Sequence, residues 1–216
     1  FRWRAPGGKA VPKSLILAEM QFATGVLTLT EAGTTRRAAM HVVRPDGLAA
    51  LDRGGVEPLG IPFDTFRERL QRENRTIKRA LTDPRILAGI GNAYSDEILH
   101  RARLSPLALS TRLDDDEVRR LHEAARATLA EWTRKLRDEA GDGFPEQVTA
   151  FREGMAVHGR HGQPCPVCGA PVQRIRYATN ETNYCARCQT EGRRLADRAL
   201  SRLLREDWPR SIDEVE

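Results

Sequence analysis

Cys165-Pro166-Val167-Cys168 and Cys185-Ala186-Arg187-Cys188 are two Cys-x-x-Cys pairs with residues 169–184 between them, and they hold all four cysteines of the chain. Two thiolate pairs at this spacing are typical of one tetrahedral zinc ion, with each pair at the end of a short β-hairpin. Two disulfides are the alternative, and they would require an oxidising compartment without explaining the doubled spacing. A closed site of Cys165, Cys168, Cys185 and Cys188 is structural, so the sequence predicts a module that folds with zinc.

The residues around and after the cysteine pairs indicate how this module is built. Turn-prone residues 179–182 separate an apolar alternating run that ends at Tyr177 from Tyr184, which leads into the second pair. The sequence therefore predicts a β-hairpin between the pairs. Basic and apolar residues alternate at helical spacing across 190–216, so we expect an amphipathic C-terminal helix packed on the zinc module.

The composition is that of a chain with ordinary, modest cores. The 216 residues carry 35 basic and 30 acidic side chains, a formal net charge of +5. Because this excess is small, a polyanionic partner would have to be met by a local basic patch. No apolar run approaches the length of a membrane span, and no secretory leader opens the sequence. With cysteines of the metal-binding type, these features predict a reducing, cytoplasmic location and no membrane partner.

Residues 1–60 have the pattern of an incomplete β-structure. We expect strands at 14–18, 25–30 and 36–43, and residues 1–4 resemble a strand cut in the middle of a sheet. Three strands without a helix make a poor independent domain. We interpret this region as the remnant of a β-sandwich whose first half is absent; a complete small β-domain is the alternative.

The central region changes to helical periodicity. We expect one helix from an N-cap at Asp64 to about Leu81, a second beginning near Ala93, and the longest after Leu113. Acidic residues 114–117 crowd the start of the longest helix, which favours capping and dipole stabilisation over a metal or catalytic role. Its expected buried face consists of Val118, Leu121, Ala125, Leu129, Trp132 and Leu136.

Gly89-Ile90-Gly91-Asn92 is a glycine-rich turn that opens the second of these helices. Glycines let a backbone approach an anion closely, and a helix N-terminus presents free N–H groups. A turn required only for packing is the alternative. Lys78 lies upstream on a helix expected to pack beside the turn, and Arg174 and Arg176 follow in the zinc hairpin. Several separate cationic and N–H groups suit successive phosphates of one nucleic-acid strand.

Two of these segments together resemble one family. Residues 75–78 followed by 90–97 resemble the helix–two-turn–helix of the formamidopyrimidine-DNA glycosylase and endonuclease VIII family, and residues 157–165 resemble the entry to its C-terminal zinc finger. The resemblance covers about residues 60–190 well and 1–60 faintly. It implies an α+β chain: a partial β-sandwich at 1–60, a mainly α helix–two-turn–helix domain at 61–155, and a four-cysteine zinc finger with a helical extension at 156–216.

The resemblance also implies a function. Members of the family flip an oxidised base out of duplex DNA, excise it and cut the abasic strand by elimination. By similarity, Lys78, Gly91 and Asn92 would bind phosphates that flank the lesion. Arg36 would fill the space left by the flipped base; an exposed strand cation is the alternative for Arg36. The expected partner is double-stranded DNA with a damaged base or abasic site, bound by a monomer with one structural zinc in a bacterial cytoplasm, near the nucleoid.

Two positions depart from the family pattern within the matched regions. Residues 35–38 resemble the family's arginine-pair loop, whose first arginine is here Arg36. Ala38 stands two residues after it, where the family usually has an aromatic wedge. Asn180 aligns with a phosphate-binding arginine of the zinc hairpin. An amide can donate a hydrogen bond there but cannot make a charged bidentate contact, although Asn180 remains an expected DNA-binding residue. Both changes indicate either incomplete lesion recognition or a divergent branch with other preferences.

The family's catalytic centre has no counterpart in this chain. Members use an N-terminal proline amine as nucleophile and a neighbouring glutamate for proton transfer, whereas positions 1 and 2 are Phe1 and Arg2. We therefore expect no catalytic residues here, and a chain that is the DNA-binding part of a bifunctional glycosylase. His158 and His161 are surplus to a four-cysteine site and are expected at the surface or on phosphates. A non-catalytic nucleic-acid-binding zinc-ribbon protein is the alternative function.

Overall fold

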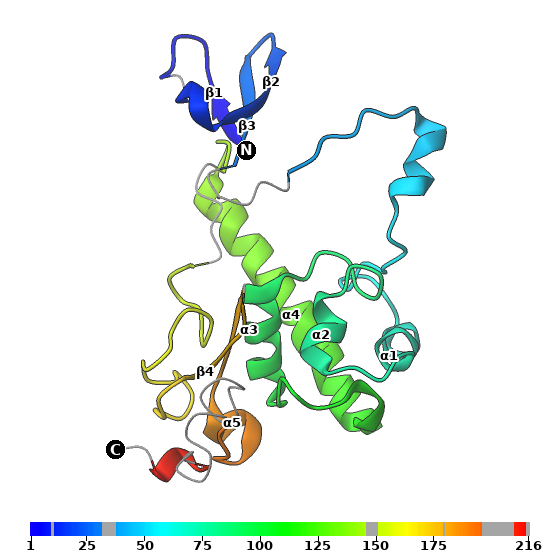
Figure 1. Cartoon of the computed structure of the whole chain (residues 1–216), viewed down its shortest axis with the longest axis vertical. Coiled ribbons are helices and arrows are strands. Elements are labelled where there is room, and N and C mark those ends of the chain that lie inside the picture. Colours follow the sequence, from blue (N-terminus) through cyan, green and yellow to red (C-terminus); the bar gives the residue numbers. More distant parts are fainter. Residues whose placement is uncertain (10, 32–37, 146–150, 179, 196–209, 215–216) are drawn as a thin grey trace. The chain divides into compact units, whose positions relative to one another are not determined.

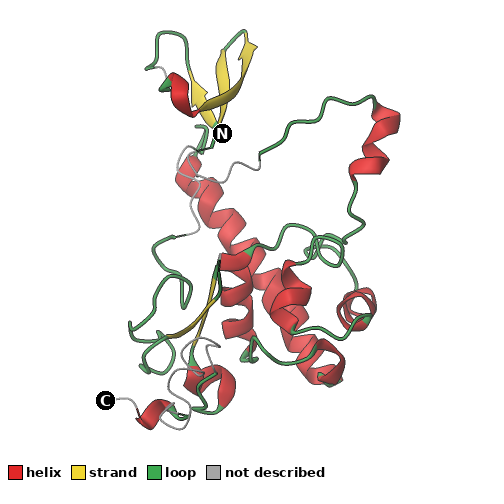
Figure 2. Ribbon diagram, viewed as in Figure 1, coloured by secondary structure: helices red, strands yellow, loops and turns green. Residues whose placement is uncertain are grey.

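The computed structural model describes residues 1–9, 11–31, 38–145, 151–178, 180–195 and 210–214. The chain divides into two compact units, one of residues 1–51 and 133–149 and the other of residues 52–132 and 150–216 (Figure 1). Mixed strands and helices confirm the α+β class (Figure 2). The domain boundaries expected at 61 and 156 stay predictions, and Arg36 lies outside the described residues.

The first unit contains a three-stranded antiparallel sheet. Its strands are β1 (Arg2–Arg4), β2 (Ile16–Phe22) and β3 (Gly25–Thr30), in the order β1-β3-β2. Gly25 begins β3 where the neighbouring strand is very close: a Cβ added there would lie 2.5 Å from the carbonyl oxygen of Arg4. A side chain at position 25 would therefore push β1 and β3 apart.

One of the three expected strands is wrong. Described residues 38–43 form no strand and lead into the 3₁₀ helix Pro45–Leu51, while β1 supplies the third strand of the sheet. The apolar residues that suggested a strand are exposed, and Val42 has 90% of its surface accessible. The pattern was not sufficient to form a strand here, because no described neighbour covers the apolar residues. The strand expected at 14–18 begins at Ile16 and runs on to Phe22.

The second unit is built on α1 (Phe63–Gln71), α2 (Ile77–Thr82), α3 (Asn92–Ala102) and the first part of α4 (Asp115–Ala140). The residues of α4 from 133 onward belong to the first unit. Figure 1 shows α3 beside α2 and α4. No helix in the described part of the chain is both long and apolar enough to cross a membrane. The predicted apolar positions are fully buried in the core of this unit: Phe66, Leu70, Ile77 and Leu81.

The single helix expected over 64–81 is interrupted, which corrects the prediction. The backbone of residues 75–77 bonds to another segment instead: the N–H of Ser110 donates to the Arg75 carbonyl at 2.7 Å, and the N–H of Ile77 donates to the Ala108 carbonyl at 2.8 Å. These long-range bonds replace the helical ones. At the start of α1 the N-cap is Pro62, and Asp64 lies in the first turn without capping the helix.

The start of α4 is a capping box, as the acidic run indicated. Asp114 Oδ1 accepts from the backbone N–H of Glu117 at 2.8 Å, and Glu117 Oε2 accepts from the N–H of Asp114 at 3.1 Å. Each carboxylate thus satisfies one N–H that the helix cannot. The expected apolar face of α4 is buried at Val118, Leu121, Ala125 and Trp132 and half-buried at Leu129 and Leu136.

Replacing this cap gives a first testable prediction. Asp114→Ala is expected to lower the free energy of unfolding by about 1 kcal/mol, because an N–H of the first turn loses its acceptor. Urea denaturation followed by circular dichroism measures the change. Asp116→Ala, an exposed acidic residue in the same turn, is the control and is expected to change stability much less. Equal losses in both variants would show that charge near the helix dipole, and not the cap, is what matters.

The zinc module (residues 156–195) is the hairpin predicted from the cysteine spacing. Strands β4 (Gln173–Arg176) and β5 (Glu181–Tyr184) pair antiparallel, and the short helix α5 (Ala186–Thr190) begins inside the second cysteine pair. The hydroxyl of Tyr184 accepts from the N–H of Leu195 at 2.7 Å and holds the chain that leaves α5. Described residues 191–195 are not helical, and the rest of the expected C-terminal helix lies mostly outside the described residues.

Candidate nucleic-acid interface

The four cysteines of the zinc module form one cluster. Their sulfur atoms all lie within 4.8 Å of one another; Cys165 Sγ is 3.9 Å from Cys188 Sγ, and Cys168 Sγ is 3.4 Å from Cys185 Sγ. Sulfurs bound tetrahedrally to zinc at about 2.3 Å are separated by roughly 3.8 Å. A disulfide requires about 2.05 Å. All four cysteines are free, so the geometry fits zinc and not the disulfide alternative.

The surroundings of the cluster hold it inside the protein. Cys165 and Cys185 are buried, and burial raises the pKa of the Cys185 thiol to about 11. A divalent cation among the sulfurs would reverse that shift, because coordination deprotonates a thiol. His100 of α3 places Nε2 at 3.3 Å from Cys165 Sγ, and burial lowers the pKa of its imidazole. His100 thus connects the cluster to the helical core, a contact that its sequence position 65 residues away did not reveal.

A groove of about 690 Å³, here called the α2–α3 groove, gathers four of the predicted DNA-binding residues. Lys78 comes from α2, Gly91 and Asn92 from the start of α3, and Asn180 from the loop between β4 and β5. Arg36 remains outside the described residues. The other lining residues are Thr76, Arg79, Thr82, Ile90, Pro106, Leu107, Ile175, Arg176, Tyr177 and Thr182.

The Lys78 ammonium is largely buried and already has partners within the protein. Its side chain is 12% exposed; the ammonium forms an ion pair with the Asp96 carboxylate and donates to the carbonyl of Asn92 at 3.1 Å. Burial lowers the pKa of Lys78, and the charge and hydrogen bond of Asp96 oppose that shift. Because an ammonium has three N–H donors, one remains for a ligand in the groove.

The glycine turn at the start of α3 has two distinct roles. Gly89 has φ +78°, a left-handed conformation that favours glycine, whereas Gly91 has φ −96° and is the N-cap residue of α3. A Cβ at Gly91 would meet nothing within 4 Å, so its absence leaves the groove open and serves no packing contact. Asn92 begins the helix, and its Nδ2 donates to the carbonyl of Glu181 at 2.9 Å. This bond ties α3 to the zinc hairpin.

Asp96 is the centre of a buried network below the groove that sequence reasoning missed. Its carboxylate is fully buried, and Oδ2 accepts from the backbone N–H of Asn183 at 3.1 Å and lies 2.8 Å from His158 Nδ1. With the Lys78 ion pair, Asp96 joins α2, β5 and the segment before the first cysteine pair. Asp96 and Glu97 belong to segment 90–97, which resembles the family's helix–two-turn–helix. The spacing of that segment did not indicate that Asp96 has three separate partners.

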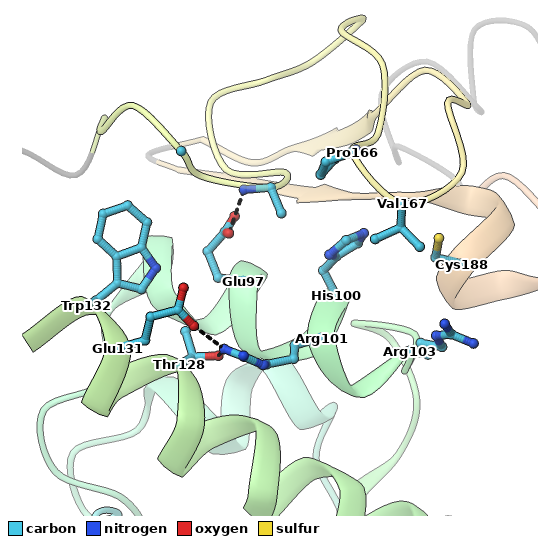
Figure 3. A pocket seen from close by; sticks show the side chains of 12 residues that line it. Glu97, His100, Arg101, Arg103, Thr128, Glu131, Trp132, Pro166, Val167 and Cys188 are labelled. Carbon is cyan, nitrogen blue, oxygen red and sulfur yellow. Dashed lines mark hydrogen bonds and ion pairs between the residues drawn. The ribbon is translucent and has the colours of Figure 1, made fainter. Parts of the chain in front are cut away.

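Glu97, the next residue on α3, organises the same segment through its backbone. Glu97 Oε2 accepts from the N–H of Ala156 at 2.7 Å, and Oε1 accepts from those of Val157 and His158, each at 2.9 Å. Figure 3 shows the Glu97 side chain pointing at this backbone. The expectation that His158 lies at the surface or on phosphate is therefore wrong, since it is buried against Asp96; His161 is exposed.

A smaller cavity of about 240 Å³ lies between α3, α4 and the first cysteine pair (Figure 3). Two of its charged side chains form an ion pair, since Arg101 Nη1 is 2.8 Å from Glu131 Oε2, and a third, Glu97, accepts from backbone N–H groups. The volume is below the range typical of small-molecule sites. This cavity is a packing seam between the helices and the zinc module, and the α2–α3 groove is the better candidate for a ligand.

Two family descriptions match the chain. The helix–two-turn–helix domain of formamidopyrimidine-DNA glycosylase matches residues 55–137, and the zinc finger found in that glycosylase and in IleRS matches residues 162–190. The match to the second and the cluster of Cys165, Cys168, Cys185 and Cys188 together support a structural zinc, as predicted.

Individual proteins similar to this chain carry the same family description. An uncharacterised formamidopyrimidine-DNA glycosylase-like protein of Mycobacterium tuberculosis is 41% identical over 151 residues, which cover 70% of this chain and 94% of that protein. A formamidopyrimidine-DNA glycosylase of Thermus thermophilus is 42% identical over 149 residues, or 65% of this chain. The match spans 55% of that glycosylase, so the chain corresponds to about half of its length.

Solved structures share the fold. The crystal structure of the MutM (Fpg) protein from Thermus thermophilus superposes with a TM-score of 0.67 at 33% identity, covering 87% of this chain and 71% of that one. A complex between Lactococcus lactis Fpg and DNA containing an abasic site gives a TM-score of 0.69 at 23% identity, covering 88% of this chain and 70% of that one.

Proposed function

The chain belongs to the formamidopyrimidine-DNA glycosylase and endonuclease VIII family, and on that basis we propose that it is the DNA-binding part of a glycosylase in base-excision repair. The single observation that carries this proposal is the α2–α3 groove. It gathers Lys78, Gly91, Asn92 and Asn180 from three separate segments of the matched domains.

Each wall of the groove supplies a different kind of hydrogen-bond donor to a phosphate group. Lys78 keeps one N–H of its ammonium for a ligand, and the start of α3 at Asn92 presents backbone N–H groups at the positive end of the helix dipole. Asn180 is exposed on the hairpin side and offers a neutral amide. Donors of this kind position a nucleic-acid backbone without reading its sequence.

The proposal extends to the catalytic activity of the parent protein, which we infer from the family. The parent activity is excision of an oxidised base followed by elimination at the abasic site, with the base flipped out of the stack and Arg36 in the space that it leaves. The preferred partner is duplex DNA that carries a damaged base or an abasic site. A cytoplasmic location near the nucleoid and a monomeric state belong to the same proposal. The Lactococcus lactis Fpg complex, which contains abasic-site DNA, supports the choice of partner.

Binding and borohydride trapping on one duplex test the proposal. The chain is expected to bind a duplex with a single abasic site at least tenfold more tightly than the undamaged duplex, a difference of about 1.4 kcal/mol. No borohydride-trapped adduct is expected, because no residue of this chain matches the family's nucleophile. A control duplex with a reduced abasic site removes the aldehyde and leaves binding intact. Equal affinity for damaged and undamaged duplexes would contradict a role in repair, and an adduct would show that an amine of this chain has lyase chemistry.

A non-catalytic nucleic-acid-binding protein is the second candidate, and one observation favours it. The match of 151 residues covers 94% of the Mycobacterium tuberculosis relative but only 70% of this chain, so that family member is shorter than this chain. Such a protein would keep the DNA-binding surface without a glycosylase centre. Tight binding to undamaged DNA or RNA, with no preference for an abasic site, would favour this candidate over the first.

A further inference from the structure

Three residues of the α2 segment form a ridge between two cavities. Thr76, Arg79 and Thr82 are spaced three residues apart and line both the α2–α3 groove and a second cavity of about 590 Å³. Their helical neighbours Ile77 and Leu81 point into the core and are fully buried. We call these three residues the α2 ridge, and the second cavity, which Asp83 also lines, the Asp83 cavity.

Apart from Arg79, the charged side chains that line the Asp83 cavity form ion pairs with one another or with adjacent residues. Arg75 Nη1 is 2.6 Å from Asp83 Oδ2, and Arg75 Nε donates to Glu73 Oε2 at 2.7 Å. Asp83 also accepts from Arg85, whose Nη2 lies 2.7 Å away. The hydrogen bonds from Arg85, with the nearby Arg75 charge, hold the pKa of the Asp83 carboxyl well below its usual range. These cations are therefore compensated before any ligand arrives.

Arg79 differs from these arginines because it is exposed and makes no ion pair with any residue that the structure describes. Lys78, its neighbour in sequence, is bound to Asp96 and largely buried. A guanidinium presents five N–H donors in a planar fork that matches a phosphate group, and it stays charged at any physiological pH. The hydroxyl of Thr76 flanks it on the ridge and is a further hydrogen-bond donor for the same anion, whereas the Thr82 hydroxyl donates to the Lys78 carbonyl at 3.0 Å.

We propose that Arg79 binds a backbone phosphate of a DNA strand that crosses the α2 ridge from the α2–α3 groove into the Asp83 cavity. The inference rests on the proposed DNA-binding function and extends its footprint beyond Lys78 and Asn92 by one phosphate. The α2 ridge is the shared wall of the two cavities, so a chain that leaves the groove on this side passes over Arg79. The contact adds affinity and register, and it does not read bases.

The test compares Arg79→Gln with Arg120→Gln on a duplex that contains one abasic site. Arg120 is an exposed arginine of α4 that lines neither cavity and has no ion pair among the described residues. Arg79→Gln is expected to bind about tenfold more weakly at low salt and to reduce the slope of log K against log salt by about 0.9. Arg120→Gln is expected to behave like the wild type. Both residues are exposed, so both variants are expected to fold, which circular dichroism checks.

A methylphosphonate walk then locates the contact. Each backbone phosphate of the duplex is replaced in turn by a neutral methylphosphonate, and affinity is measured for the wild type and Arg79→Gln. One position is expected to weaken the wild type and leave Arg79→Gln unchanged. Identical salt slopes and identical walks for Arg79→Gln and the wild type would overturn the inference and leave the proposed function intact. A wild-type chain that binds no abasic duplex would overturn both.

Discussion

Chelation of zinc is expected to unfold the zinc module and abolish DNA binding, while the helical core of the second unit stays folded. The hydrophobic cluster around the cysteines is small and includes Val157, Ala170 and Val172 beside the sulfur atoms themselves. Structural zinc in zinc-finger peptides contributes about 10–16 kcal/mol, which a core of this size cannot replace. The helical core has its own larger cluster, with Phe66 and Ile98 fully buried.

Unfolding of the zinc module is expected to abolish DNA binding because β5 contacts α3 beside the α2–α3 groove. Asn183 in this strand donates its N–H to Asp96, and the Glu181 carbonyl accepts from Asn92, so an unfolded hairpin removes one wall of the α2–α3 groove. Cys185→Ala is expected to reproduce the effect of chelation, because Cys185 is a fully buried member of the cluster. The measurements are zinc content, amide hydrogen exchange in β4 and β5, and affinity for an abasic duplex.

Val167→Ala is the matched control for that variant. Val167 lies inside the first cysteine pair but is 60% exposed, so its replacement is expected to retain zinc and binding. Protected amides in β4 and β5 after complete removal of zinc would contradict the prediction. A loss of helical circular dichroism as large as that of global unfolding would instead show that the helical core depends on the metal.

The sequence was most informative where chemistry fixes spacing. Two Cys-x-x-Cys pairs can satisfy tetrahedral zinc in few ways, so the ligand cluster and the hairpin between Cys168 and Cys185 were predictable. Helical periodicity likewise identified buried positions such as Phe66 and Val118. The break between α1 and α2 was not predictable in this way, because backbone bonds to residues 108–110 outweigh a continuous apolar stripe.

Residues whose role depends on contacts distant in sequence could not be identified from local pattern. His158 lies against a carboxylate 62 residues earlier in the chain, and His100 meets Cys165 across 65 residues. The position of Arg79 on a shared wall also depends on which segments fold around it. Local spacing predicts elements and metal ligands, whereas partners of buried charges emerge only from the tertiary fold.

Asp96→Ala is expected to lower the free energy of unfolding of the second unit by about 3–5 kcal/mol. The change leaves the Lys78 ammonium without its ion-pair partner in a site where its side chain is 12% exposed, and it removes the acceptor of the Asn183 N–H. His158 Nδ1 loses its partner as well. Chemical denaturation measures the loss, and Glu123→Ala, an exposed acidic residue of α4, is expected to change stability little.

A double-mutant cycle distinguishes loss of the ion pair from loss of the other contacts of Asp96. Lys78→Met alone leaves the buried Asp96 carboxylate without its cation and is expected to destabilise strongly. Lys78→Met combined with Asp96→Ala is expected to cost at least about 1 kcal/mol less than the sum of the two single changes, because neither partner is left charged and buried. Additive losses would mean that Asp96 stabilises the unit through Asn183 and His158, with Lys78 held in place by other groups.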